Sequence, residues 1–172
     1  TIHTTGKGLV NFVMSYRKLT RLPSPESTLF DVRPFLERMV QLALHQHSYP
    51  NIHIVLEEVQ EDLMVFADES LLTQVMTNLL KNAVQAIGDA LEGEIRIRAY
   101  CDDQDMVRIE VSNNGPKIAP EVAEQMFVPF FTTKEEGSGI GLSLSKQIMR
   151  LQGGSIALLP YKDEWTTFVV VL

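Results

Sequence analysis

Two pairs of strand-like segments constrain the fold of this chain most strongly. In the first pair, residues 94–101 (EIRIRAYC) and 106–113 (MVRIEVSN) alternate apolar and polar side chains on either side of the turn-like Asp102–Asp105. In the second pair, residues 154–160 (GSIALLP) shortly precede residues 165–172 (WTTFVVVL). Short connections join strands as antiparallel neighbours, so these pairs predict a mostly antiparallel sheet.

Helical patterns are interleaved with the strands. Asp31 and Asp68 stand where N-caps are expected, each before a segment with apolar residues at helical spacing. The predicted helices are 1–21, 31–47, 69–91, 120–126 and the segment that runs on from the glycine stretch at 137–141, and further strands are predicted at 51–59 and 63–67. The apolar face of the second helix is expected to hold Phe35, Leu36, Met39, Val40 and Leu44. This order predicts an α+β sandwich with helices on one face of the sheet.

Composition excludes several classes of function. The formal net charge of −7 at pH 7, with no cluster of Lys and Arg, argues against nucleic acid or an anionic membrane surface as the main partner. The single Cys101 excludes a disulfide framework and a cysteine zinc site, and it fits a reducing compartment. The chain begins with Thr1 inside a helical pattern, so we expect a cytoplasmic fragment of a longer protein, whose membrane attachment the sequence leaves open.

The stretch Gly137–Met149 reads GSGIGLSLSKQIM. Glycines at a helix start expose backbone N–H groups near the positive end of the helix dipole, which suits a phosphate chain. The stretch lacks the Lys of a Walker loop and the glycine spacing of a dinucleotide fingerprint. Taken alone, it fits a flexible loop with a helix cap equally well.

A stripe of amides on the long helix favours the ligand interpretation. Gln74, Asn78, Asn82 and Gln85 recur every three or four residues between closely spaced apolar residues. Asn is a poor helix former, and buried amides need hydrogen-bond partners. A solvated face is the alternative explanation. An amide oxygen is a hard ligand that suits Mg²⁺ beside substrate phosphates.

Four motifs in order then resemble those of bacterial sensor histidine kinases, in their nitrogen-regulation-like subclass. DESLLTQVMTNLLKNAVQA resembles the N box, VSNNGPKIAPE the first glycine box, MFVPFFTTK the F box and GSGIGLSLSKQI the second glycine box. The resemblance covers residues 31–172 and implies the Bergerat fold, a two-layer α/β sandwich that binds ATP with Mg²⁺. Residues 1–22 resemble part of the dimerisation and phosphoacceptor hairpin, and residues 23–30 are the predicted linker.

The resemblance implies site residues by position. Asn82 matches the Mg²⁺-binding Asn of the family, and Asn78 one turn earlier would support the metal and phosphates. Gly137, Gly139 and Gly141 match the glycines of the family's lid, with Ile140 and Leu142 between and after them. Lys134, after Thr133, would reach the phosphates or remain solvated. The F-box aromatics are expected to anchor the lid or to dock on the hairpin helix, with plain core packing as the alternative, and they are Phe127, Phe130 and Phe131.

The first glycine box departs from the family pattern at two positions. The two positions are Asn113 and Lys117, and in the family they contact the nucleotide base together with the positions of Gly115 and Ile118. Asn113 stands where the family has an Asp that accepts a hydrogen bond from the adenine amino group, and Lys117 replaces a glycine. An amide lacks the charge of a carboxylate, so we expect weaker ATP binding and relaxed discrimination against guanine.

The resemblance implies a protein histidine kinase that moves the γ-phosphoryl group of ATP to a histidine on a separate dimerisation domain. The acceptor is expected outside this chain, because His3 heads HTTGKG without the family's acidic residue and Pro. A response regulator and a homodimeric parent protein are the implied partners, with ATP or ADP bound and no nucleic acid. Two alternatives stay open: a degenerate nucleotide-sensing or docking module, and an ATPase of the topoisomerase branch.

The remaining titratable residues are interpreted as surface groups. His45 and His47 end a predicted helix, and His53 lies on the strand face opposite the apolar one; a metal cluster is the less favoured reading. Adjacent acidic residues diverge, so the pairs Asp102–Asp103 and Glu135–Glu136 are taken as solvated loop charge.

Overall fold

The computed structural model describes residues 13–14, 17, 22–47, 49–89, 92–132 and 139–172. Within these residues, a main sheet has the strand order β2-β4-β5-β7-β6, and a separate ribbon pairs β1 with β3. The strands are β1 (Thr28–Asp31), β2 (Ile52–Val59), β3 (Met64–Ala67), β4 (Gly93–Cys101), β5 (Val107–Asn113), β6 (Ser155–Leu158) and β7 (Thr166–Val171). The helices are α2 (Val32–Gln46), α3 (Glu69–Ile87), α4 (Pro120–Gln125) and α5 (Gly141–Leu151). Most of the predicted first helix lies outside the described residues.

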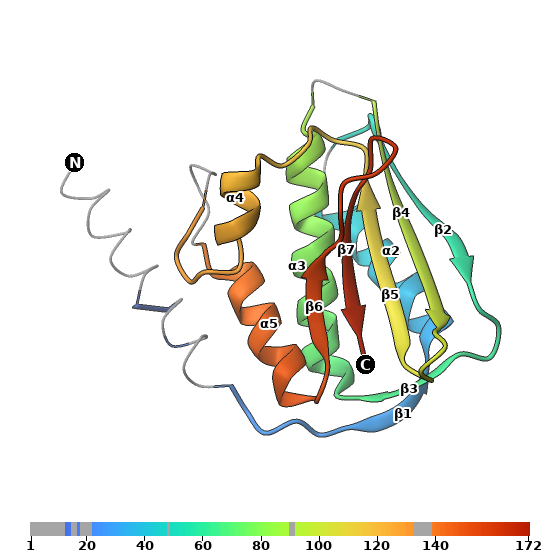
Figure 1. Ribbon diagram of the computed structural model, residues 1–172. Coiled ribbons are helices and arrows are strands. Elements are labelled where there is room, and N and C mark those ends of the chain that lie inside the picture. Colours follow the sequence, from blue (N-terminus) through green and yellow to red (C-terminus); the bar gives the residue numbers. More distant parts are fainter. Residues whose placement is uncertain (1–12, 15–16, 18–21, 48, 90–91, 133–138) are drawn as a thin grey trace.

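The main sheet is mixed, with one parallel pair. Strand β2 runs parallel to β4, whereas β4–β5, β5–β7 and β7–β6 are antiparallel neighbours. Figure 1 shows α2 and α3 behind the strands of the main sheet, with α5 beside α3. Helices α2, α3 and α5 contact β2, β5 and β6 in turn, while the opposite face of the sheet stays open. The predicted α+β fold with a mostly antiparallel sheet and helices on one face is confirmed.

Helix α3 lies at the centre of the helical layer. Its apolar face is buried from Leu71 to Ile87, and it packs against β4 and β5 on one side and α5 on the other. The helix was predicted to run to Leu91 but ends at Ile87. Gly88 adopts a φ of +68° and donates its N–H to Val84 O, which terminates the helical path.

The ribbon of β1 and β3 was predicted only in part. The pattern at 63–67 predicted strand β3, but the segment 23–30 was predicted only as a linker. Its last residues form β1, with Leu29 opposite Phe66 in antiparallel register. Both side chains are more than 60% exposed, so their pairing leaves no burial pattern that marks β1 in the sequence.

The hydrophobic core lies between the helices and the inner face of the main sheet. Helix α2 contributes Phe35, Leu36, Met39 and Ala43, each less than 9% exposed. Leu44 was predicted on this face but is 45% exposed, because the buried stripe continues through its neighbour Ala43 instead. The core is therefore continuous from α2 across α3 to α5.

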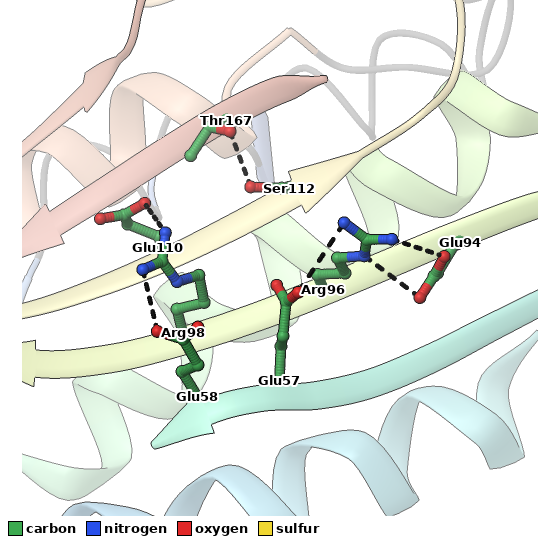
Figure 2. A network of polar contacts seen from close by, with 8 residues as sticks. All are labelled: Glu57, Glu58, Glu94, Arg96, Arg98, Glu110, Ser112 and Thr167. Atoms are coloured by element: carbon green, nitrogen blue, oxygen red, sulfur yellow. Dashed lines mark hydrogen bonds and ion pairs between the residues drawn. The ribbon is translucent and has the colours of Figure 1, made fainter. Parts of the chain in front are cut away.

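The open face of the main sheet is covered by charged side chains. Figure 2 shows opposite charges alternating across β2, β4 and β5. Arg96 contacts Glu94 at 3.2 Å and Glu57 at 3.8 Å, and its guanidinium stacks over Trp165 at 4.1 Å from the ring centroid. Exposed ion pairs of this kind contribute little stability singly, so this face mainly keeps the sheet solvated. None of the helices in the described residues is long and apolar enough to cross a membrane.

The turn between β4 and β5 is organised by Asp102. Its Oδ1 accepts hydrogen bonds from the N–H groups of Gln104 at 2.9 Å and Met106 at 3.0 Å. The bond from Met106 is the main reason that the pKa of the Asp102 carboxyl is lowered. The carboxylate of Asp102 therefore closes the turn that the sequence predicted, in addition to being loop charge, and the neighbouring Asp103 is exposed as expected.

Asp68 supplies the first prediction. Its carboxylate caps α3 by accepting from Leu71 N–H at 3.0 Å, and it also accepts from Glu26 N–H at 2.7 Å. These hydrogen bonds lower the pKa of Asp68 below its ordinary value of 3.8, and the bond from Glu26 has the largest effect. We predict that Asp68→Ala lowers the free energy of unfolding by about 1–2 kcal/mol at pH 7, measured by urea denaturation.

The pH dependence of that loss follows from the direction of the shift. A carboxyl with a lowered pKa in the folded state stabilises above its unfolded pKa, and the contribution disappears as pH falls through the folded pKa. The difference between wild type and Asp68→Ala should therefore shrink below about pH 4. Asp68→Asn is the control, since it can still cap the helix without titrating. An unchanged difference at pH 3 would contradict this account.

Candidate functional site

Strand β5 ends at Asn113, which the main sheet buries to 2% exposure. In the sheet register it lies opposite Ile95 of β4 and Thr166 of β7. Its Oδ1 accepts a hydrogen bond from the backbone N–H of Gly115 at 3.0 Å. A backbone N–H can only donate, so this bond fixes which end of the carboxamide faces the loop. Asn113 thereby organises the turn that leaves β5.

Gly115 packs closely against the end of α3. A Cβ at this position would lie 3.0 Å from Ala86 O and 3.0 Å from Asn113 Oδ1. Such contacts are tighter than side chains normally tolerate, so the position requires glycine for close approach rather than for an unusual φ. The loop after β5 is therefore held directly against α3.

Thr166 is a site residue that the sequence analysis did not identify. It is 3% exposed, and its hydroxyl Oγ1 has no hydrogen-bond partner among the described residues. Residues opposite each other in a sheet point to the same face, so Thr166 and Asn113 lie side by side on the inner face. A buried hydroxyl without a partner is costly, which makes it a candidate ligand contact. The sequence offered one indication of this role, because Thr166 is a polar residue in the predicted terminal strand, but only the fold places it opposite Asn113.

A cavity of about 330 Å³ opens beside Thr166. Its walls come from the loop after β5, α4 and the connection between β6 and β7, and include Ile118, Leu158 and Pro160. Lys117 is exposed at this cavity, with Nζ 5.3 Å from the ring centroid of Tyr161. The ammonium of Lys117 is thus directed over the Tyr161 ring, an arrangement typical of a cation–π contact.

Asn78 links α3 to α5. Its Nδ2 donates to Gly141 O at 3.2 Å and to Ser145 Oγ at 3.2 Å. Ser145 Oγ itself donates to Gly141 O at 2.8 Å. With both amide hydrogens directed to α5, the oxygen Oδ1 is the atom through which Asn78 could act on a metal or a bound ligand.

The predicted amide stripe is buried only at its centre. Asn78 and Asn82 are half-buried, but Gln74 and Gln85 are exposed. The expectation of a continuous stripe of enclosed amides was therefore wrong at both ends. Helix α5 runs from Asn78 towards the start of α3, where Gln152 bonds Asp68, so it does not extend over Gln85. Among the described residues, no cluster of three or more His, Cys, Asp and Glu could hold a metal ion. Oxygen ligands for a metal such as Mg²⁺ would therefore have to come from side-chain amides and from the substrate.

Helix α5 begins at Gly141 without a side-chain cap from the described residues. Ile140 occupies the N-cap position and is 5% exposed, and Leu142 is half-buried against the core. The first N–H groups of a helix have no partner within the helix and carry partial positive charge. The start of α5 can therefore accept an anionic group such as a phosphate.

The segment before α5 is held by a contact between Gly139 and Phe130. Phe130 N–H donates to Gly139 O at 2.7 Å, and both residues have positive φ. Phe127 packs edge-on against the core residue Phe168, with ring centroids 6.3 Å apart. Phe127 thus packs against the core, which was the alternative to the roles expected for it. The predicted contacts of Thr133, Lys134 and Gly137 lie outside the described residues.

Comparison with known proteins identifies the family. The family model described as histidine kinase-, DNA gyrase B-, and HSP90-like ATPase matches residues 67–172, from the end of β3 to the end of the chain. The chain belongs to this family. The C4-dicarboxylate transport sensor protein DctB of Rhizobium meliloti (strain 1021) is 41% identical over 113 residues, which are 65% of this chain and 18% of that protein. This chain therefore spans less than a fifth of that relative.

Solved structures of histidine kinases share the fold. The catalytic domain of histidine kinase ThkA, in a nucleotide-free form, aligns with a TM-score of 0.74 at 34% identity over 86% of this chain and 95% of that chain. ThkA in complex with the response regulator protein TrrA aligns with a TM-score of 0.79 at 30% identity, covering 99% of this chain and 48% of that one. The resemblance to the catalytic domain of sensor histidine kinases is confirmed.

The glycine before α5 gives a second prediction. Gly139 and Gly153 both have a φ of +74°, but a Cβ on Gly139 would lie 2.4 Å from the backbone of Phe130, whereas one on Gly153 would meet nothing within 4 Å. We predict that Gly139→Ala lowers ATP affinity at least tenfold by calorimetry, because the loop before α5 must move.

Gly153→Ala is the matched control for that prediction. It carries the same backbone strain without the clash, so it should cost about 1 kcal/mol of stability and leave ATP affinity unchanged. Equal ATP affinities for the two variants would contradict the role given to Gly139.

Proposed function

We propose that this chain transfers the γ-phosphoryl group of MgATP to a histidine on a separate dimerisation domain. The observation that carries the proposal is the uncapped start of α5, which Asn78 ties to the middle of α3, while the loop after Asn113 rests on the end of the same helix at Ala86. A triphosphate placed there would reach unpaired N–H groups with its phosphates and buried polar side chains with its base.

The residues present fit a nucleotide. The unpartnered Thr166 hydroxyl and the buried Asn113 offer polar contacts to a base edge, and Ile118 offers an apolar surface beside the cavity. Gly115 holds the loop that follows Asn113 against the end of α3. We further assign to the phosphates the backbone of Gly137, Gly139, Ile140, Gly141 and Leu142, with Thr133 and Lys134, and to the rim of the base site Lys117.

The amides of α3 are suited to a magnesium ion carried by the triphosphate. Asn82 is half-buried on α3, and Asn78 lies one turn earlier with its oxygen available. An amide oxygen is a neutral hard ligand of the kind that Mg²⁺ accepts alongside phosphate oxygens. When bound, the ion would neutralise charge on the phosphates.

Catalysis by these residues would consist of positioning and charge stabilisation. Phosphoryl transfer asks little covalent chemistry of the protein, since the transferred group passes directly from the leaving to the attacking oxygen or nitrogen. The backbone N–H groups at the start of α5 would hold the phosphates, and the base contacts would fix the nucleotide's orientation. The histidine acceptor comes from the partner domain.

The wider assembly follows from the same proposal. Residues 1–22 would belong to the dimerisation hairpin, 23–30 to a linker and 31–172 to the catalytic domain, within a homodimeric parent of the nitrogen-regulation-like subclass. The hairpin histidine would pass its phosphoryl group to a response regulator. A solved complex of ThkA with the response regulator protein TrrA supports this order of partners. The catalytic domain would work on the cytoplasmic side, whatever the membrane attachment of the parent.

A transfer assay tests the proposal. The chain is mixed with the dimerisation domain of its parent and MgATP carrying a γ-phosphate label. We predict acid-labile label on a histidine of the partner domain and none on this chain. Asn82→Ala should reduce transfer at least a hundredfold, since it removes a hard oxygen ligand at the phosphates.

Gln74→Ala is the control on the same helix, because its amide is exposed. It should transfer at the wild-type rate. ATP binding without transfer would instead support the nucleotide-sensing or docking module, and steady hydrolysis without a labelled partner would support the topoisomerase-type ATPase. Absence of any nucleotide binding would contradict the proposed function itself.

A further inference from the structure

The orientation of the Asn113 carboxamide is set by its surroundings. The side chain is 2% exposed, and its oxygen accepts the Gly115 N–H at 3.0 Å. A flipped amide would set an NH₂ group against that N–H, leaving two donors face to face in a buried place. Gly115 cannot withdraw to relieve such a flip, because it packs against Ala86 O. The polar atom of Asn113 left for a ligand is therefore Nδ2, a donor.

A donor at this position reverses the polarity expected from the family pattern. An Asp here would turn one carboxylate oxygen to the Gly115 N–H and keep the other as an acceptor for the adenine amino group. Asn113 keeps the first contact and replaces the second oxygen with an NH₂ group. Adenine would then present an amino donor to an amide donor, and neither could pair. The amide oxygen cannot compensate, since it faces the loop.

The neighbouring hydroxyl completes a pattern. Thr166 lies opposite Asn113 in register, and its buried Oγ1 has no partner among the described residues. A hydroxyl can donate or accept, so it adapts to either kind of base. The pair thus presents one fixed donor beside one adaptable group. A 6-oxopurine has the matching edge, with an O6 acceptor beside an N1–H donor, whereas adenine has an amino donor beside an N1 acceptor.

We propose that the base site of this chain accepts 6-oxopurine nucleotides at least as well as ATP. In this arrangement Asn113 Nδ2 donates to O6 and Thr166 Oγ1 accepts from N1–H. ATP remains a substrate, bound without a direct bond from Asn113 to its amino group. The inference rests on the proposed nucleotide site and specifies the class of base that it takes. Asn113 is thereby a specificity-determining residue.

Calorimetric titration of the chain with ATP and with inosine triphosphate, each with Mg²⁺, tests the inference. Inosine triphosphate carries the 6-oxo edge without the 2-amino group of guanine, so it isolates the contact. We expect it to bind wild type at least as tightly as ATP. Asn113→Asp should shift the ratio of the two dissociation constants at least tenfold toward ATP, since a carboxylate accepts from the amino group and repels O6.

Asn114→Asp is the matched control. The same change of residue is made one position further on, where the exposed Asn114 accepts from Glu94 N–H at 2.8 Å and faces β4. This variant should leave the ratio unchanged. If Asn114→Asp shifted it as much as Asn113→Asp, the effect would be one of added charge and the inference would fall.

The remaining outcomes separate the inference from the proposed function. If wild type bound ATP tenfold more tightly than inosine triphosphate, the inference would be overturned but the proposed nucleotide site would remain. The same conclusion would follow if Asn113→Asp left the ratio of the two dissociation constants unchanged. Failure of both nucleotides to bind wild type would overturn the proposed function together with the inference. Thermal unfolding of each variant shows whether it is folded, and Thr166→Ser, which retains the hydroxyl, should keep the wild-type ratio.

Discussion

Burial of helix α3 between the main sheet and α5 positions the candidate site. The apolar face of α3 from Leu71 to Ile87 fixes the helix against β4 and β5, and this packing brings Asn78 to the start of α5. The far end of the same helix supplies the backbone against which Gly115 rests. A change in how α3 packs would therefore move the amides, the start of α5 and the loop after β5 together.

The polar groups around this helix divide into two kinds. Asp68 at its start has its hydrogen-bond partners, and these bonds serve stability. Near the other end of the helix, Thr166 Oγ1 lacks a partner among the described residues. Helix α5 begins beside Asn78, in the middle of α3, without a side-chain cap from those residues. Buried polar groups are normally satisfied, so the unpaired Thr166 Oγ1 beside the cavity is a candidate ligand contact. The partial positive charge at the start of α5 suits an anionic group of the ligand, and the Thr166 hydroxyl suits a polar edge of its base.

Features that depend on local periodicity could be predicted from the sequence. The β4–β5 pair, the caps at Asp31 and Asp68 and the order of the motifs belong to this group, because neighbouring residues determine them. Strand β1 could not be predicted, since its partner β3 lies far along the chain and both expose apolar residues. The direction of the Asn113 amide likewise needed Gly115 and Ala86, which only the folded chain brings together.

The most direct test of the account is to record backbone amide spectra of the isotopically labelled chain during titration with MgATP. If the nucleotide binds along α3 between the loop after β5 and the start of α5, the amide resonances of Gly115, Gly139 and Gly141 should shift. Those of Tyr100 and Arg108 should stay in place, because these residues pair at the end of β4 and β5 that lies away from Asn113. Shifts confined to that end of the two strands, with these glycine resonances unchanged, would contradict the account.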